Sequence, residues 1–196
     1  RQYGSFAEYV VVPEKNAVKF EDSVSFEQGA FFEPATVALH GLKRLDYKGG
    51  KNVAILGGGT IGLLTMQWAK IFGAKQVVVF DIEPARLELG KRLGATAGIN
   101  TKEEDFMEQA MALTDGKGFD YIYETAGNTI TMKMAFKLAA NKAQVCFIGT
   151  PTRELSFSVD EWECMNRKEF TLTGSWMSYS APFPGEEWKL AAHYFK

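Results

Sequence analysis

The sequence is poor in cysteine, in net charge and in long apolar runs. Its two cysteines, Cys146 and Cys164, lie far apart, without a CxxC pair or a histidine at metal-ligand spacing. We therefore expect reduced thiols in a cytoplasmic protein. A net charge of −2 gives no general attraction to phosphate backbones or anionic lipids, so neither nucleic acid nor a membrane is expected as a partner. No apolar run is long enough to cross a bilayer.

In other respects the composition is ordinary. Hydrophobic residues make up 46% of the 196 positions and charged residues 23%, which suits one domain with an appendage. The chain starts at Arg1 without a methionine and stops at Lys196 inside a predicted helix. We expect it to be a piece of a longer protein.

A glycine-rich turn follows the apolar run at 53–56. Gly57, Gly59 and Gly62 have the spacing with which a strand enters a helix beneath a dinucleotide. The first glycine allows a tight turn, the second lets the backbone approach a diphosphate, and the third lets helix and strand pack closely. The N–H groups at the start of the helix, around Thr60 and Ile61, would face the diphosphate. The alternative is a glycine turn in another kind of α/β domain.

A carboxylate ends the next apolar run. Asp81 follows Gly62 by 19 residues, near the offset at which an acid accepts the ribose hydroxyls. A 2′-phosphate would meet this carboxylate at short range, so the pattern favours NAD over NADP. Arg86 could accept a 2′-phosphate, stack on adenine or pair with a surface acid, and with Asp81 present we favour stacking or pairing.

Strands alternate with helices from residue 53 onward. This order predicts a doubly wound six-stranded parallel (Rossmann) α/β sheet with helices on both faces. The expected strands are 53–56, 76–81, 97–100, 120–124, 144–148 and 169–174, and the expected helices are 60–72, 84–94, 101–113, 129–140 and 160–166, with a last one from about 184. The helix at 101–113 is expected to open with a capping box at Thr101.

The first 50 residues lie outside this alternation. They predict a strand at 6–12, a short helix from a capping box at Ser25 to about 32, and a helix at 35–45. Pro34 disfavours helix at Glu33, so we expect a break there. We assign 1–45 to the end of a preceding domain with linking helices, and 46–196 to the dinucleotide-binding domain.

Small residues end several of the predicted strands, where doubly wound sheets bind ligands. They are Thr125-Ala126-Gly127, Ile148-Gly149-Thr150 and Gly174-Ser175. Glycines often simply end strands, but their repetition here favours cofactor contact. Glu33 lies in apolar company and is either a helix-end acid facing water or a metal ligand or proton acceptor. His40 is interpreted as a packed histidine.

The chain resembles the medium-chain zinc-dependent dehydrogenases of the alcohol and polyol type over its whole length. The matching segments are 4–9, 33–40, 57–64, 124–127 and 174–180. The first three are shared widely among polyol and threonine dehydrogenases. The last, continued to Trp188, is narrower and indicates a branch acting on sugar-alcohol phosphates such as galactitol 1-phosphate.

The resemblance implies an NAD-dependent, zinc-assisted oxidation of a polyol or polyol phosphate to the ketose. Glu33 falls on one zinc ligand, and the cysteine and histidine ligands belong to a GroES-like catalytic domain that is largely absent, so the fragment should bind nucleotide without turnover. The implied nicotinamide contacts are Thr36, Ile148, Gly149, Thr150 and Ser175, and the implied adenosine contacts are Asp81, Arg86, Thr125 and Ala126. A homo-oligomer through the last strand is also implied.

Other interpretations stay open at this point. A sorbitol- or threonine-type dehydrogenase differs mainly in the segment 174–188. A zinc-free nucleotide-binding protein of the same fold would have no reason to keep an acid at Glu33. A SAM-binding methyltransferase shares the strand and glycine loop but does not explain Glu33-Pro34.

Overall fold

The computed structural model describes residues 4–178 and 182–195. A short 3-10 helix η1 (Glu14–Asn16), α1 (Phe26–Ala30) and α2 (Phe32–Lys43) precede the sheet. The rest of the described chain comprises β1 (Asn52–Leu56), α3 (Thr60–Ile71), β2 (Gln76–Asp81), α4 (Pro84–Arg92), β3 (Ala97–Asn100), α5 (Phe106–Ala112), β4 (Phe119–Glu124), α6 (Thr129–Leu138), β5 (Ala139–Phe147), α7 (Val159–Lys168), β6 (Thr171–Gly174) and α8 (Gly185–Tyr194). Within this part of the chain, no helix has the length and apolar character needed to cross a bilayer.

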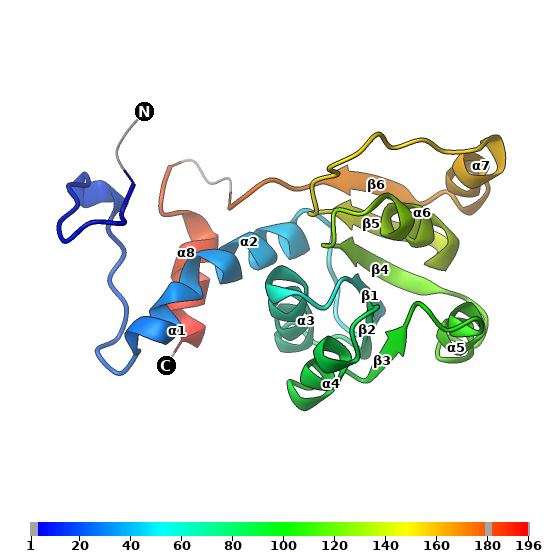
Figure 1. Cartoon of the computed structure of the whole chain (residues 1–196), viewed down its shortest axis with the longest axis horizontal. Coiled ribbons are helices and arrows are strands. Elements are labelled where there is room, and N and C mark those ends of the chain that lie inside the picture. The colour runs from blue at the N-terminus through cyan, green and yellow to red at the C-terminus, as the bar shows by residue number, and fades with distance from the viewer. Residues whose placement is uncertain (1–3, 179–181, 196) are drawn as a thin grey trace.

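The six strands form one parallel sheet in the order β3-β2-β1-β4-β5-β6. The order reverses between β1 and β4, which is the doubly wound arrangement, and the predicted fold class is confirmed. Figure 1 shows β1 and β2 in the middle of the molecule, with β3 and β6 at opposite edges.

Side chains alternate between the two faces of the sheet. Val53 and Ile55 of β1 enter a cluster formed with α2, α3 and α8, whereas Ala54 and Leu56 enter a second cluster formed with α5 and α6. All four are fully buried. A strand that is covered on both faces has an almost continuous apolar sequence instead of alternating apolar and polar residues. For this reason β1, β2 and β4 could be predicted from their apolar residues.

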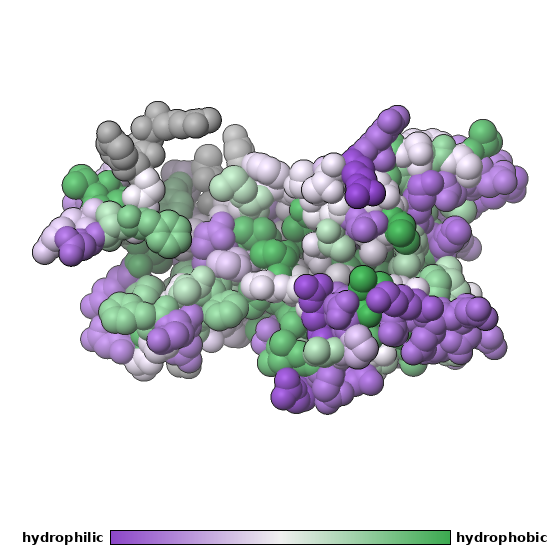
Figure 2. Space-filling view, in the orientation of Figure 1, coloured by the Kyte–Doolittle hydropathy of each residue, from purple (hydrophilic) through white to green (hydrophobic). Residues whose placement is uncertain are grey.

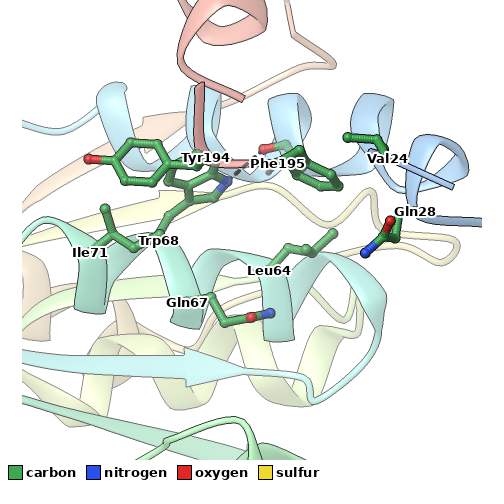
Figure 3. A pocket seen from close by; sticks show the side chains of 9 residues that line it. Val24, Gln28, Leu64, Gln67, Trp68, Ile71, Tyr194 and Phe195 are labelled. Carbon is green, nitrogen blue, oxygen red and sulfur yellow. Dashed lines mark hydrogen bonds between the residues drawn. The ribbon is translucent and has the colours of Figure 1, made fainter. Parts of the chain in front are cut away.

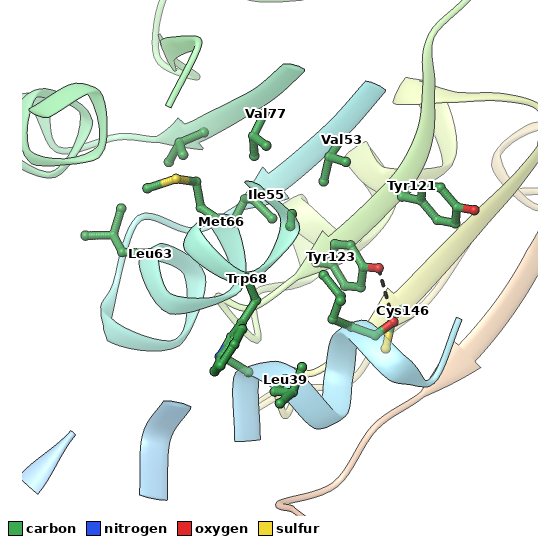
Figure 4. Close-up of a cluster of buried hydrophobic side chains, with 14 of the residues drawn as sticks. Leu39, Val53, Ile55, Leu63, Met66, Trp68, Val77, Tyr121, Tyr123 and Cys146 are labelled. Atoms are coloured by element: carbon green, nitrogen blue, oxygen red, sulfur yellow. Dashed lines mark hydrogen bonds between the residues drawn. The ribbon is translucent and has the colours of Figure 1, made fainter. Parts of the chain in front are cut away.

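Helix α2 packs across α3 and is covered in turn by α8. The Trp68 indole N–H donates to the Ala35 carbonyl at 2.8 Å, which joins α3 to α2 inside the apolar cluster. On the sheet side of α2, the Tyr123 hydroxyl donates to the Leu42 carbonyl at 3.4 Å (Figure 4). These bonds satisfy polar atoms that would otherwise be costly to bury.

The predicted strand at 6–12 is wrong. These residues form no strand, and their apolar side chains lie at the surface, with Phe6, Tyr9 and Val11 almost wholly exposed. The N-terminal segment extends away from the sheet in Figure 1, and apolar surface is visible at that end of the molecule in Figure 2. A strand needs a partner for its N–H and C=O groups, and the described residues do not supply one here.

Some helix boundaries also differ from the predictions. The break expected at Glu33 lies earlier, at Phe31, and α2 begins at Phe32 with Pro34 in its first turn. Proline is tolerated there because first-turn N–H groups have no partner within the helix. The capping box expected at Thr101 is absent, because the Asn100 side chain accepts the Lys102 N–H at 3.0 Å and holds a turn that delays α5 to Phe106.

The last two strands begin at other residues than expected. Strand β5 starts at Ala139, directly after α6, where a helix to 140 was expected. Glu169 adopts a left-handed conformation, with φ of 50°, that ends α7, so β6 starts only at Thr171. The capping box at Ser25 is present as predicted, and a second one at Ser158 opens α7.

Candidate functional site

The glycine turn between β1 and α3 lies at the carboxyl edge of the sheet, and its glycines are needed for different reasons. Gly57 has φ of 105°, and a Cβ on Gly62 would lie 1.8 Å from the Gly57 carbonyl oxygen, so the turn and α3 could not pack as they do. A Cβ on Gly59 would meet nothing within 4 Å. The surface beside Gly59 is therefore open to the close approach of a ligand.

The N-terminus of α3 has unpaired backbone donors. Its N-cap is Gly59, no side chain caps it, and no acid lies in its first turn, which starts with Thr60 and Ile61. By contrast, α6 is capped by the Asn128 side chain and α7 by Ser158. First-turn N–H groups without partners, together with the helix dipole, suit an anion such as a diphosphate.

Asp81 lies directly beside this turn and is 7% exposed. Its Oδ2 accepts the Gly58 N–H at 2.7 Å, and its Oδ1 accepts the Glu83 N–H at 2.9 Å. The Arg86 guanidinium is 3.5 Å from the same Oδ2, while the Arg86 side chain stays 55% exposed. The predicted acid and the predicted arginine thus meet: Arg86 does form a pair, but with the buried Asp81 rather than with a surface acid.

A hollow of about 520 Å³ opens next to Asp81, within the size range of small-molecule sites. We call it the edge hollow. Apolar side chains of Ile82, Phe106 and Ile130 offer contacts for a flat ring, and Asp81 offers an acceptor for hydroxyls. The residues around the edge hollow are Gly57, Phe80, Asp81, Ile82, Arg86, Thr101, Lys102, Phe106, Ala126, Asn128, Ile130, Thr131 and Met134.

The loop after β4 forms the opposite wall of the edge hollow. The Thr125 hydroxyl lies within hydrogen-bond distance of two carbonyl oxygens, those of Leu56 at 3.0 Å and Gly57 at 3.1 Å, so it fastens this loop to the glycine turn. Ala126 lines the hollow itself. Thr125 and Ala126 are therefore brought to Asp81 and Arg86, as a shared ligand requires.

Glu124, at the end of β4, was missed as a site residue. It is fully buried, and burial raises the pKa of its carboxyl, against the opposing effect of the Thr131 hydroxyl and the Ala126 and Gly127 N–H groups. It could have been noticed as an acid that ends an apolar strand, which is the same signal that singled out Asp81. Asn128 and Lys102, which also line the edge hollow, carried no such signal.

The remaining predicted residues lie on the side of the edge that faces α2. Gly41 of α2 packs so closely that a Cβ there would lie 2.3 Å from Ile148 Cδ1 and 3.8 Å from Ser175 Oγ. The Ser175 hydroxyl is buried and has no hydrogen-bond partner within the described chain. Thr36 is fully buried, and its hydroxyl donates to the Glu33 carbonyl at 2.7 Å.

Gly149 and Thr150 complete this group. The Gly149 N–H donates to the Glu124 carbonyl at 3.0 Å, which sets the chain beyond β5 against the end of β4. Thr150 is exposed. None of the residues predicted to contact nicotinamide lines the edge hollow, so the structure separates them from the residues around Asp81.

Glu33 is exposed in the first turn of α2. Among residues 4–178 and 182–195, no three His, Cys, Asp or Glu side chains gather in a way that could hold a metal ion. The described residues therefore do not fit a zinc site by themselves, since one carboxylate holds zinc weakly.

His40 and Glu187 form a second polar cluster, between α2 and α8. His40 Nδ1 lies 3.1 Å from Glu187 Oε1, and Lys43 Nζ lies 3.7 Å from the same oxygen. Burial alone would raise the pKa of Glu187, but its own backbone N–H, His40 and Lys43 together hold that pKa below its ordinary value. The packed role expected for His40 fits this contact.

A second hollow of about 270 Å³ lies between α2, α3 and α8 (Figure 3). Its wall is mainly apolar, from Leu64, Trp68, Ile71 and Phe195, with amides of Gln28 and Gln67 at the side. No charged side chain lines it. It has no carboxylate like that of Asp81, and it lies away from the glycine turn and the uncapped N-terminus of α3.

Comparisons with known proteins agree with this geometry. Residues 60–193 match the family model of the zinc-binding dehydrogenases. The chain is 40% identical over 192 residues to galactitol 1-phosphate 5-dehydrogenase of Escherichia coli K12, covering 98% of this chain and 56% of that protein. It is 35% identical over 150 residues to sorbitol dehydrogenase of Bacillus subtilis 168, covering 76% of this chain and 42% of that protein.

Solved structures show the same relationship. The crystal structure of the Escherichia coli galactitol-1-phosphate dehydrogenase superposes with a TM-score of 0.91 at 39% identity, covering 98% of this chain and 56% of that one. A protein of Sinorhizobium meliloti 1021 assigned as a zinc-binding dehydrogenase and bound to NADP gives 0.84 at 32% identity, covering 98% and 55%. The chain thus spans about half the length of the relatives that it matches, and the resemblance inferred from its motifs is confirmed.

Proposed function

The chain belongs to the zinc-binding dehydrogenase family, and we propose that it is the nucleotide-binding part of an NAD-dependent enzyme that oxidises an alcohol. One observation carries the proposal: a buried acceptor, Asp81, lies between an uncapped helix start and the edge hollow. The diphosphate would lie on the α3 N-terminus beside Gly59, and the adenosine in the edge hollow. The bound nicotinamide then supplies the hydride acceptor.

The choice of NAD rests on charge at the ribose position. Asp81 Oδ2 has one N–H donor and one guanidinium nearby, so a carboxylate lone pair can still accept a ribose hydroxyl. A 2′-phosphate placed there would face a buried negative charge, which is costly. Arg86 and Lys102 at the same hollow are the features that favour NADP, the nucleotide bound by the Sinorhizobium relative.

The nicotinamide end would lie toward α2. The buried Ser175 hydroxyl without a partner supports this placement, because such a group usually binds something in the functional state. We assign Thr36, Ile148, Gly149 and Thr150 to the same end. Thr36 would contact the nicotinamide through its backbone, since its hydroxyl already donates a hydrogen bond to the Glu33 carbonyl.

Glu33 would supply one carboxylate ligand to a zinc ion. Its exposure in the first turn of α2 leaves the carboxylate accessible to a zinc ion whose other ligands come from elsewhere. The described residues do not complete such a site. The substrate would be a polyol or polyol phosphate, which follows from the similarity to the galactitol-1-phosphate and sorbitol dehydrogenases.

We also propose that two copies associate through β6. This strand lies at the edge of the sheet and pairs only with β5 within the described residues, so its other side has N–H and C=O groups free to pair with a second copy.

Calorimetric titration of the chain with NADH and with NADPH tests the proposal, with energy transfer from tryptophan to the nicotinamide as a second signal. We expect NADH to bind at least tenfold more tightly than NADPH. Tighter binding of NADPH would overturn the assignment of Asp81 and favour Arg86 as a phosphate ligand. Binding of neither nucleotide would favour the interpretation of a fold that no longer binds nucleotide.

A further inference from the structure

Glu124 has an arrangement of contacts that packing alone does not require. Its Oε1 accepts three donors: the Ala126 N–H at 3.0 Å, the Gly127 N–H at 3.0 Å and the Thr131 hydroxyl at 2.7 Å. Thr131 lies on α6, so one carboxylate oxygen joins the strand end, the loop and the next helix. Each donor bond to a charged acceptor is stronger than a neutral one.

The same residue also joins β4 to β5. Its carbonyl accepts the N–H groups of Ile148 and Gly149, at 2.8 and 3.0 Å. A Cβ on Gly149 would lie 2.7 Å from Glu124 Oε2, so the carboxylate fills the space that this glycine leaves. Glu124 therefore connects the wall of the edge hollow with the segment assigned to nicotinamide.

The loop that it holds contributes directly to the edge hollow. Ala126, Asn128, Ile130 and Thr131 are four of the residues that line it. The loop also contains Gly127, whose φ of 65° is a conformation that glycine adopts readily. Thr125 and Asn128 also hold this loop, but through neutral acceptors and donors, whereas Glu124 offers it a carboxylate.

We propose that Glu124 is a positioning residue for the nucleotide: its buried carboxylate fixes the 125–131 wall of the edge hollow without touching the ligand. The proposal rests on the proposed function, because the edge hollow must bind a nucleotide for the position of its wall to matter. A buried carboxylate costs desolvation free energy, which three donors to one oxygen offset.

Glu124→Gln tests the role with minimal change of shape. The amide oxygen is neutral and accepts three donors less well than the carboxylate does. In the wild-type chain Glu124 Oε2 lies 3.3 Å from the Gly127 nitrogen, and an amide nitrogen in its place would bring two donors face to face. Val53→Ala is the control, since Val53 is fully buried near the start of β1, in the apolar cluster on the sheet face that α3 covers. It weakens packing without touching the loop.

The probe is ADP-ribose, which carries the adenosine and diphosphate and is stable over the pH range needed. At about pH 8 we expect Glu124→Gln to weaken ADP-ribose binding about tenfold or more, and Val53→Ala to leave it within about twofold. Thr131→Val removes one of the three donors to Glu124, together with the contact of that hydroxyl with the Asn128 carbonyl at 2.8 Å, and should weaken binding about threefold. It decides the outcome if Glu124→Gln does not fold.

The pH profile separates positioning from general stability. The groups that meet Glu124 from α6, the loop and the end of β5 are uncharged, and the charged groups of the hollow, Asp81, Arg86 and Lys102, are the same in both proteins. Binding to the wild-type chain should weaken as the pH falls and Glu124 becomes protonated, and this component should be missing in Glu124→Gln.

Wild-type-like binding by Glu124→Gln, or by folded Thr131→Val where Glu124→Gln does not fold, would overturn the positioning role. So would equal weakening by Glu124→Gln and Val53→Ala, or a pH profile of Glu124→Gln that matches that of the wild type. If the wild-type chain itself does not bind ADP-ribose, the proposed function fails as well.

Discussion

The carboxylate of Asp81 accepts the backbone N–H of Gly58 at 2.7 Å, so the acid that ends β2 also holds the glycine turn that follows β1. Parallel pairing sets Leu56 opposite Phe80, which brings the ends of the two strands together at the same edge. The residue proposed to choose the nucleotide is thus part of the support of the diphosphate turn, and changing it should affect both.

Replacing Asp81 by asparagine should reduce the preference for NADH. The asparagine oxygen can still accept the Gly58 N–H, but the charge that binds the ribose hydroxyls and repels a 2′-phosphate is gone. Hydrogen bonds to charged groups contribute about 1.5–3 kcal/mol, so NADH binding should weaken about tenfold or more while NADPH binding does not. Calorimetry measures both. Asp46→Asn, at an exposed site, is the control, and an unchanged ratio would contradict the prediction.

Two alanine substitutions in the glycine turn should have opposite consequences. A Cβ at Gly59 meets no protein atom within 4 Å, so Gly59→Ala should fold normally yet weaken NADH binding about tenfold, because it fills the space beside the diphosphate. A Cβ at Gly62 collides with the Gly57 carbonyl, so Gly62→Ala should lose about 1–3 kcal/mol of stability.

Urea denaturation and NADH titration of both variants check this difference. A strongly destabilised Gly59→Ala, or a Gly62→Ala of wild-type stability, would show that the turn has another geometry.

The Glu187 contact predicts a pH-dependent attachment of α8 to α2. The pKa of Glu187 is lowered in the folded chain, so its contribution to stability is present above the ordinary glutamate pKa and is lost as the pH falls through the lowered value. Glu187→Gln should therefore lower the free energy of unfolding by about 1–2 kcal/mol at neutral pH and by less near about pH 3.

Urea denaturation of both proteins at the two pH values measures this difference. The exposed neighbour Glu186, replaced by glutamine, is the matched control, and its effect should stay below about 1 kcal/mol. A difference between wild type and Glu187→Gln that is independent of pH would speak against the charged contact.

Association through β6 predicts that a charge on this strand opposes dimerisation. Thr173→Lys should shift sedimentation equilibrium toward the monomer, because charged side chains on an edge strand discourage pairing with another chain. Ala112→Lys adds the same charge at an exposed position of α5, which packs against β3 at the opposite edge of the sheet, and should leave association unchanged. A wild-type chain that stays monomeric at all concentrations would refute the proposed interface.

The sheet could be predicted from sequence because its signals are local. Residues 53–56 and 77–80 are apolar on both faces, as buried parallel strands require, and Gly57 adopts the positive φ that a tight turn after β1 needs. Even the short strand expected at 97–100 is present, as β3, and it pairs with β2. For the candidate site, the spacing from Gly62 to Asp81 was enough to bring the turn and the acid together.

The features that were missed depend on contacts between distant residues. His40 and Glu187 are 147 positions apart, and no local pattern joins them. The role of Glu124 depends on donors from a loop and a helix that only the folded chain assembles. The predicted strand at 6–12 failed for the opposite reason: its local pattern is right for a strand, but pairing is a property of two segments.

The helices that follow the strands differ in the capping of their N-termini, and this difference affects where along the sheet edge an anion can bind. Helices α3, α6 and α7 follow β1, β4 and β5, and the latter two begin with side chains already bound to their first N–H groups. An anion arriving at this edge therefore has to compete with Asn128 or Ser158 at those two starts, but with no side chain at α3. Among these three helix starts, α3 alone leaves its first-turn N–H groups without a capping side chain, so it is the start at which a diphosphate displaces no protein hydrogen bond.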